Sequence, residues 1–187
     1  MMTWEERYAA GLPYRDFVDR YGTNAHRERW QAAYDRIELA PAQGELLRGF
    51  QRRMYLLCLA GTWCGDCVRD GPILQRIAEV SARIGLRFLD RDEHPDLAQA
   101  LAINEGLRVP MVIFLSEDFF ECGRYGERTL ATYRRMAAER LGPHGPAGIV
   151  APGEGYLQTV TQEWLDEIER VQLLLRLSPR LRARYGD

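Results

Sequence analysis

The spacing of apolar residues changes character at residue 54. Before it, apolar residues recur every three or four positions between short interruptions, which predicts several helices over residues 1–53. From residue 54 onward, short continuous apolar runs alternate with helical patterns, and such runs are typical of strands buried on both faces. The four predicted strands cover residues 54–61, 86–90, 109–116 and 119–126. Only Glu117 and Asp118 separate the last two strands, so they are predicted to pair as a hairpin.

Helical patterns lie between and after these strands. They run from Cys67 to about Gly85 and then over residues 94–103, 127–142 and 161–178. The order strand–helix–strand–helix–strand–strand–helix predicts an α/β fold in which strands separated by helices pair in parallel. Residues 142–155 are rich in Gly and Pro and predict a loop, and the last residues predict a short basic tail. We divide the chain into a helical extension packed on the core, a central α/β domain, and a loop with a C-terminal helix, at residues 1–53, 54–141 and 142–187.

Composition and charge exclude several classes of protein. The 187 residues carry a net charge of −2 and are 46% hydrophobic, which argues against disorder and against a charge-driven partner such as nucleic acid. No apolar run approaches the roughly 18–20 residues that a membrane helix needs, so no membrane association is expected. The polar start, MMTWEERYAAG, does not resemble a secretory signal. We therefore expect a cytoplasmic protein whose cysteines are thiols unless they work by oxidation.

The segment TWCGDC, residues 62–67, places two cysteines where a strand gives way to a helix. Cys64 and Cys67 are separated by Gly65 and Asp66, a spacing that lets them close a small disulfide loop. At a helix N-terminus the dipole and the unpaired backbone N–H groups stabilise a thiolate. This pattern predicts Cys64 as the exposed nucleophile and Cys67, one turn further along, as the buried resolving thiol.

Other uses of these cysteines fit the sequence less well. A structural zinc site would need two further ligands, and there is no second paired motif. A cysteine hydrolase would need a histidine base near Cys64, and no histidine is an obvious candidate. Cys58 lies in an apolar run and Cys122 lies on the last predicted strand, so both are interpreted as packing residues. A role for either as an additional resolving thiol is the less favoured alternative.

The surroundings of the motif resemble the thioredoxin superfamily. The resemblance rests on the strand, on Trp63 with the cysteine pair, on Pro72 five residues after Cys67, and on Val109-Pro110 before a later strand. It covers roughly residues 54–141 and is strongest to bacterial thioredoxin family proteins with a WCGDC motif and helical extensions. It implies a thioredoxin-like fold with a central mixed sheet flanked by helices. It also implies that Pro110 is cis and faces the cysteines, that Trp63 covers the site surface, and that Pro72 kinks its helix.

The sequence departs from this family pattern at the buried acid. Many thioredoxins carry a carboxyl group six residues before the first cysteine, and here that position is Cys58. The neighbouring lysine position falls near Phe88, so the usual buried proton relay is expected to be absent. Asp66 can oppose the Cys64 thiolate or accept the Cys67 proton, and Arg69 can offset its charge. We expect Cys64 to titrate within reach of neutral pH.

These inferences favour a thiol–disulfide oxidoreductase that works as a reductase. Its cofactor would be the redox-active disulfide between Cys64 and Cys67 alone. Its partners would be a disulfide-containing protein or small thiol as substrate, and a thioredoxin reductase or low-molecular-weight thiol as reductant. The alternative is a binding or adaptor protein with little redox turnover, which uses its helical extensions to recognise a partner.

Overall fold

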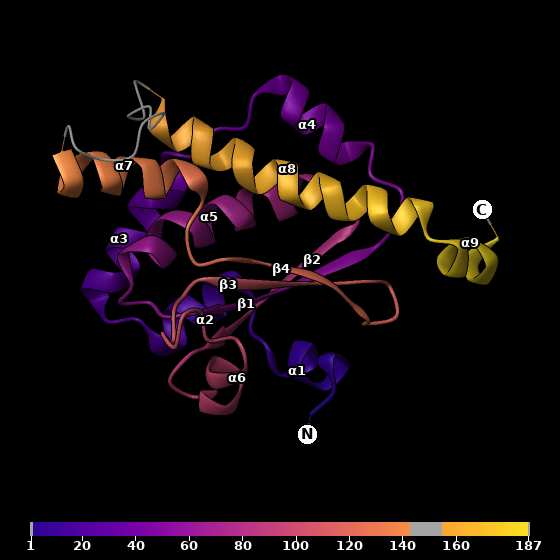
Figure 1. Ribbon diagram of the computed structural model, residues 1–187, viewed down its shortest axis with the longest axis horizontal. Helices are drawn as coiled ribbons and strands as arrows, with labels where there is room; N and C mark the ends of the chain where they lie inside the picture. The colour runs from indigo at the N-terminus through magenta and orange to yellow at the C-terminus, as the bar shows by residue number, and fades with distance from the viewer. Residues whose placement is uncertain (1, 143–154, 187) are drawn as a thin grey trace.

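A four-stranded mixed sheet forms the centre of the protein (Figure 1). The structure is a computed structural model that describes residues 2–142 and 155–186. The strands lie in the order β2-β1-β3-β4. Their bounds are Met54–Ala60 for β1, Ile84–Asp90 for β2, Met111–Leu115 for β3 and Glu121–Gly126 for β4. The fold is α/β, with the mixed sheet and flanking helices that the sequence predicts.

The prediction that helix-separated strands pair in parallel is right for one pair and wrong for another. Strand β1 pairs in parallel with β2 but antiparallel with β3, and β3 pairs antiparallel with β4 as expected for a hairpin. A parallel β3 would need a crossover along the sheet. The connection instead stays at one end of the sheet, because β2 ends opposite Ala60 and β3 begins opposite Leu59. Both partners lie at the carboxyl end of β1.

Helices cover both faces of the sheet. Helices α5 and α8 cross one face with α3, α4 and α7 around them, and α1 and α6 lie on the other side in Figure 1. An ion pair joins α1 to α6, with 2.6 Å between Arg7 Nη2 and Asp96 Oδ2. No helix in either described range is long and apolar enough to cross a membrane. The helices are α1 Trp4–Ala10, α2 Tyr14–Tyr21, α3 Asn24–Asp35, α4 Pro41–Arg48, α5 Gly65–Val80, α6 Pro95–Ala100, α7 Leu130–Leu141, α8 Tyr156–Leu177 and α9 Pro179–Tyr185.

The helices before β1 contribute to the main core. Trp30 on α3 is 1% exposed and packs edge-on against Phe17 of α2 and Phe88 of β2. Its ring also fills the space beside Gly71 of α5, where an added Cβ would lie 2.4 Å from the indole. The indole N–H donates a hydrogen bond of 2.9 Å to the carbonyl of Thr62. Helix α3 therefore holds both α5 and the turn that precedes the cysteine pair.

The C-terminal segment differs from the predicted basic tail. It forms α9, whose first turn is capped by the Ser178 hydroxyl and whose Leu181 is buried. Arg180 and Arg184 both bind Asp118 in the β3–β4 turn, and the Arg184 Nη1 to Asp118 Oδ2 distance is 2.9 Å. Hydrogen bonds from Arg180 hold the pKa of Asp118 well below its usual range. Paired charges and one apolar contact order this end, whereas its composition alone indicates a solvated tail.

Several predicted boundaries shift by a few residues. Helix α5 ends at Val80, not near Gly85, because β2 already begins at Ile84. Helix α8 begins at Tyr156, five residues before its predicted start at Thr161. The predicted loop over 142–155 lies outside the described residues except at Gly142 and Gly155.

Candidate active site

The cysteine pair lies where β1 passes into α5. Strand β1 ends at Ala60, and the backbone N–H of Cys64 donates a hydrogen bond of 3.1 Å to the carbonyl of Gly61, which closes the turn. Cys64 is the N-cap of α5 and is half-buried, and Cys67 is completely buried in the first helical turn. Both are free thiols. The position at the start of α5 and the burial of Cys67 agree with the sequence prediction, whereas Cys64 is half-buried and not exposed.

The pKa values of the two thiols shift in opposite directions. The Cys67 side chain and the backbone N–H groups of Cys67 and Asp66 lower the pKa of Cys64 to about 7, although burial and the Asp66 charge oppose the shift. Burial, followed by the hydrogen bond with Cys64, raises the pKa of Cys67 well above its ordinary value. At neutral pH, Cys64 is therefore a substantial fraction thiolate while Cys67 holds its proton.

The alkylation rate of reduced protein by iodoacetamide is expected to rise with pH and to be half-maximal near pH 7, because only the thiolate reacts. Two pH units lower, about 1% of Cys64 is thiolate and alkylation is correspondingly slow. Mass spectrometry of samples quenched at successive times would give the alkylation rate at Cys64. The same measurement on Cys64→Ser would give the background alkylation of the other thiols. A half-maximal alkylation rate below pH 5 or above pH 8.5 would contradict the assigned stabilisation of the Cys64 thiolate.

The segment before β3 forms the opposite wall of the site. The peptide bond between Val109 and Pro110 is cis, and both residues are buried. The Cys64 thiol donates to the Val109 carbonyl, with 3.5 Å between Sγ and O. The structure thus brings together the two segments that the sequence predicts to meet, although 45 residues separate them along the chain.

Trp63 gives the site an exposed aromatic surface. Its side chain is 44% exposed, and the Arg91 guanidinium carbon lies 4.5 Å above the ring centroid. The Trp63 indole packs closely against Gly61, because a Cβ on Gly61 would lie 2.7 Å from the ring. Gly65 begins α5 beside it, is exposed, and has no atom within 4 Å of an added Cβ. Trp63 and Gly65 therefore form a surface exposed to solvent.

Asp66 is held by two arginines. Arg69 Nη1 donates to Asp66 Oδ1 at 3.0 Å, as expected from the sequence, and Arg128 Nε lies 2.8 Å from Asp66 Oδ2. Arg128 precedes α7 and was not predicted to take part, because nothing in the local sequence links it to the motif. The two guanidinium groups offset the Asp66 charge. The Asp66 charge raises the pKa of Cys64 less than the hydrogen bonds from Cys67 lower it.

A buried carboxyl group lies near the site after all, on α5. Asp70 is completely buried and forms a bidentate pair with Arg69, at 2.7 Å from Nε to Oδ1 and 2.8 Å from Nη2 to Oδ2. Burial raises the pKa of Asp70, against the opposing charge of Arg69. Burial and then the Asp70 charge raise the pKa of Cys58, which is completely buried in β1. Cys58 occupies the usual position of the acid, as the sequence predicts, whereas the buried carboxyl group of Asp70 comes from α5 and was not predicted.

A helical pattern in the sequence could have revealed Asp70. It follows Cys67 by three positions and precedes Leu74 by four, so it lies on the same helix face as these two buried residues. Pro72 is also buried inside α5, which continues through it. A charged residue on the buried stripe of a helix indicates a paired or functional group.

The remaining candidate ligands and thiols lie apart. Cys122 is at the β4 end that adjoins the β3–β4 turn, while the site adjoins the other end, where Gly126 pairs with Met111. Its thiol donates to the Phe120 carbonyl at 3.4 Å. Among the residues with described positions, the His, Cys, Asp and Glu side chains form no group of three that could hold a metal ion.

Comparisons with known proteins agree with this architecture. A family model described as Thioredoxin matches residues 11–140, so its match includes α2 to α4 as well as the sheet. A Pseudomonas aeruginosa protein of unknown function has a similar structure, with a TM-score of 0.71 and 25% sequence identity over 91% of this chain and 99% of that one. An HIV epitope scaffold has a similar fold, with a TM-score of 0.67 and 23% identity over 95% of this chain and 99% of its own. No curated protein matches the sequence. Because the family model spans more than half of its residues, this chain belongs to the thioredoxin family.

Proposed function

We propose that the protein is a thiol–disulfide oxidoreductase that reduces disulfides through Cys64 and Cys67. The observation that carries the proposal is the unequal pair at the start of α5. Cys64 is partly accessible and its pKa is lowered to about 7, whereas Cys67 is buried beside it and protonated. The Val109 carbonyl and the exposed ring of Trp63 flank the thiol and offer a substrate polar and apolar contacts.

The reaction proceeds by two thiol–disulfide exchanges. The Cys64 thiolate attacks one sulfur of a substrate disulfide, which forms a Cys64–substrate disulfide and releases the other substrate sulfur as a thiolate. Cys67 then loses its proton and attacks Cys64 Sγ, which releases the second substrate thiolate and leaves a Cys64–Cys67 disulfide. Two electrons pass to the substrate, and both released thiolates take up protons from solvent. A reductant then returns two electrons to the pair and restores the two thiols.

The proposed setting is a reducing cytoplasm, where this cycle runs towards substrate reduction. The substrate class is a disulfide in a protein or between small thiols. The proposed reductant is a thioredoxin reductase or a low-molecular-weight thiol. No bound cofactor is needed, because the cysteine pair itself carries the electrons.

Trapping a reaction intermediate tests the proposal. In Cys67→Ser, the mixed disulfide at Cys64 cannot resolve, so incubation with a protein disulfide should give a covalent adduct that dithiothreitol releases. Cys64→Ser should give neither adduct nor turnover. Cys122→Ser is the matched control, because that thiol lies at the far end of β4, and it should retain full turnover.

The proposed function also requires that the unmodified protein reduce a disulfide at a measurable rate. The reduction of a model protein disulfide, with dithiothreitol as electron source, should proceed above the dithiothreitol background only when both cysteines are present. Turnover that survives Cys64→Ser would contradict the proposal. Absence of both turnover and adduct would also contradict it and would favour the adaptor function.

A further inference from the structure

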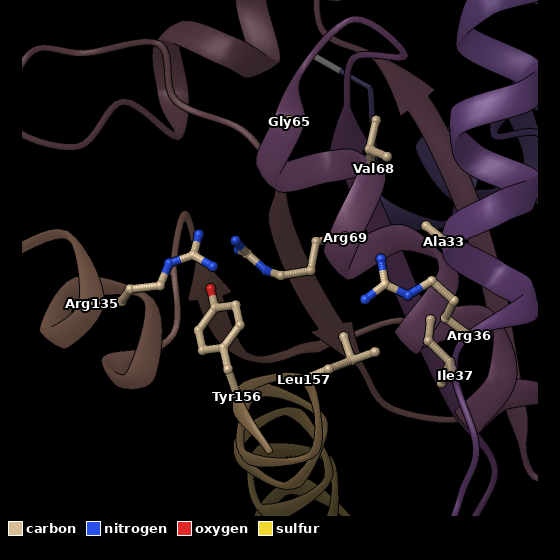
Figure 2. A pocket seen from close by; sticks show the side chains of 9 residues that line it. All are labelled: Ala33, Arg36, Ile37, Gly65, Val68, Arg69, Arg135, Tyr156 and Leu157. Atoms are coloured by element: carbon tan, nitrogen blue, oxygen red, sulfur yellow. The ribbon is translucent and has the colours of Figure 1, made fainter. Parts of the chain in front are cut away.

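A cavity of about 250 Å³ lies beside the first turn of α5. Four helices contribute to its lining, which comes from α3 and the residues after it, from α5, from α7 and from the start of α8 (Figure 2). The lining residues are Ala33, Arg36, Ile37, Gly65, Val68, Arg69, Arg135, Tyr156 and Leu157. Gly65 belongs to the TWCGDC segment, but neither Cys64 nor Cys67 lines the cavity. The cavity is therefore adjacent to the thiol site and separate from it.

The described lining carries three arginines and no acidic residue. In Figure 2 the guanidinium groups of Arg69 and Arg135 face each other next to the Tyr156 hydroxyl, and that of Arg36 lies on the other side of Arg69. The guanidinium carbon of Arg135 is 4.1 Å from the Tyr156 ring centroid, which fixes its position over the ring. Three cations, from the end of α3, from α5 and from α7, thus converge on one small cavity.

These arginines retain unused hydrogen-bonding capacity. Asp66 and Asp70 accept from three of the five Arg69 N–H groups, which leaves two. The Arg135 Nε is buried and has no hydrogen-bond partner within the described parts of the chain, and its nearest carboxylate, Glu139, lies 3.6 Å away. Arg36 is exposed and forms no ion pair with any residue in the described ranges. Unused guanidinium N–H groups match the paired oxygens of a carboxylate or phosphate.

We propose that this cavity binds a small molecule through a carboxylate or phosphate group, which Arg36 and Arg135 hold with the free N–H groups of Arg69. Its volume is below the 300–1,000 Å³ that is usual for drug-sized ligands, so it suits a compact anion better than a dinucleotide. Ile37, Val68 and Leu157 provide an apolar wall for a short carbon skeleton. The site goes beyond the proposed redox function and does not depend on it, because no thiol contributes to the lining.

Calorimetric titration of the full-length reduced protein tests the site, with sodium phosphate and sodium citrate as separate probes. Uncharged dithiothreitol keeps the thiols reduced without competing for the cavity. We expect one equivalent of at least one anion to bind at millimolar concentration or below. Arg36→Gln and Arg135→Gln should each weaken that binding about tenfold or more, the fold-change that corresponds to losing one charge-assisted hydrogen bond. The anion that binds identifies the recognised group.

Arg29→Gln is the matched control, because it removes an exposed arginine of α3 that does not line the cavity. It should change the affinity less than twofold. Arg36 is exposed, so Arg36→Gln should fold normally, and an unchanged melting temperature without anion verifies this. Failure of both anions to bind below about 10 mM overturns the proposal, as does equal weakening by Arg29→Gln and Arg36→Gln. Because the readout is binding, its result is independent of whether the protein reduces disulfides.

Discussion

Trp30→Ala is expected to lower the free energy of unfolding by about 3–5 kcal/mol, the range for removing a large aromatic side chain from a core. Trp30 is 1% exposed and touches Phe17, Phe88 and the backbone beside Gly71, so its removal leaves a cavity shared by α2, α5 and β2. It also leaves the Thr62 carbonyl without its 2.9 Å hydrogen bond. Urea unfolding followed by far-UV circular dichroism would measure the loss.

Two further variants separate packing from hydrogen bonding. Trp30→Phe retains most of the apolar contact but removes the indole N–H, and it should cost about 1–3 kcal/mol because a buried carbonyl loses its donor. Trp63→Ala is the matched tryptophan control, since that ring is 44% exposed, and it should change the unfolding free energy far less. A loss below about 1 kcal/mol in Trp30→Ala would contradict the assigned role of α3.

Asp70→Asn is expected to lower the free energy of unfolding by about 3 kcal/mol, the lower end of the range for breaking a buried ion pair. The Arg69 side chain is only 13% exposed, and both its Nε and its Nη2 donate to Asp70. Burial works against the charged form of Arg69, but the charge and hydrogen bonds of Asp70, together with the Tyr156 and Asp66 charges, outweigh it and raise the pKa of Arg69. Without the carboxylate, a guanidinium that cannot lose its proton stays buried with Asp66 as its remaining partner.

The comparison with Asp166→Asn would isolate the effect of burial, because Asp166 is an exposed aspartate on α8 and its replacement should cost at most about 0.5 kcal/mol. Denaturant unfolding of both variants at pH 7 would provide the comparison. If Asp70→Asn were as stable as Asp166→Asn, the pair with Arg69 would contribute nothing to the fold. Asp70→Asn should also weaken any anion binding in the adjacent cavity, because Arg69 would no longer be fixed at its wall.

Much of the site could be predicted from the sequence because its determinants are local. A continuous apolar run predicts buried β1, and the change to a helical period places Cys64 at the start of α5. The approach of Val109-Pro110 to the cysteine pair is predicted by the family resemblance alone. Interactions between distant segments were missed, since the period of a pattern does not say which element packs against which. The antiparallel direction of β3 and the pairing of Arg128 with Asp66 are of this kind.

Asp70 was missed for a different reason. The family pattern directs attention to the position of Cys58, whereas in this protein α5 contributes the buried carboxylate whose charge affects Cys58. The helical period of the residues after Cys67 contains the necessary information. At this position the periodicity of buried residues in α5 predicts the buried carboxylate, whereas the family pattern does not.

The hydrogen bond from Trp30 to Thr62 has a consequence for how the molecule opens. It ties the turn before the cysteines to a helix that precedes β1 in the chain, so local opening of that turn must break its hydrogen bond to α3. The amide hydrogens of α3 and of the Cys64 turn should therefore exchange with solvent as one cooperative unit. Deleting residues 1–53 would remove α3 and leave the turn without its hydrogen-bond donor. The minimal folding unit is accordingly expected to begin before β1.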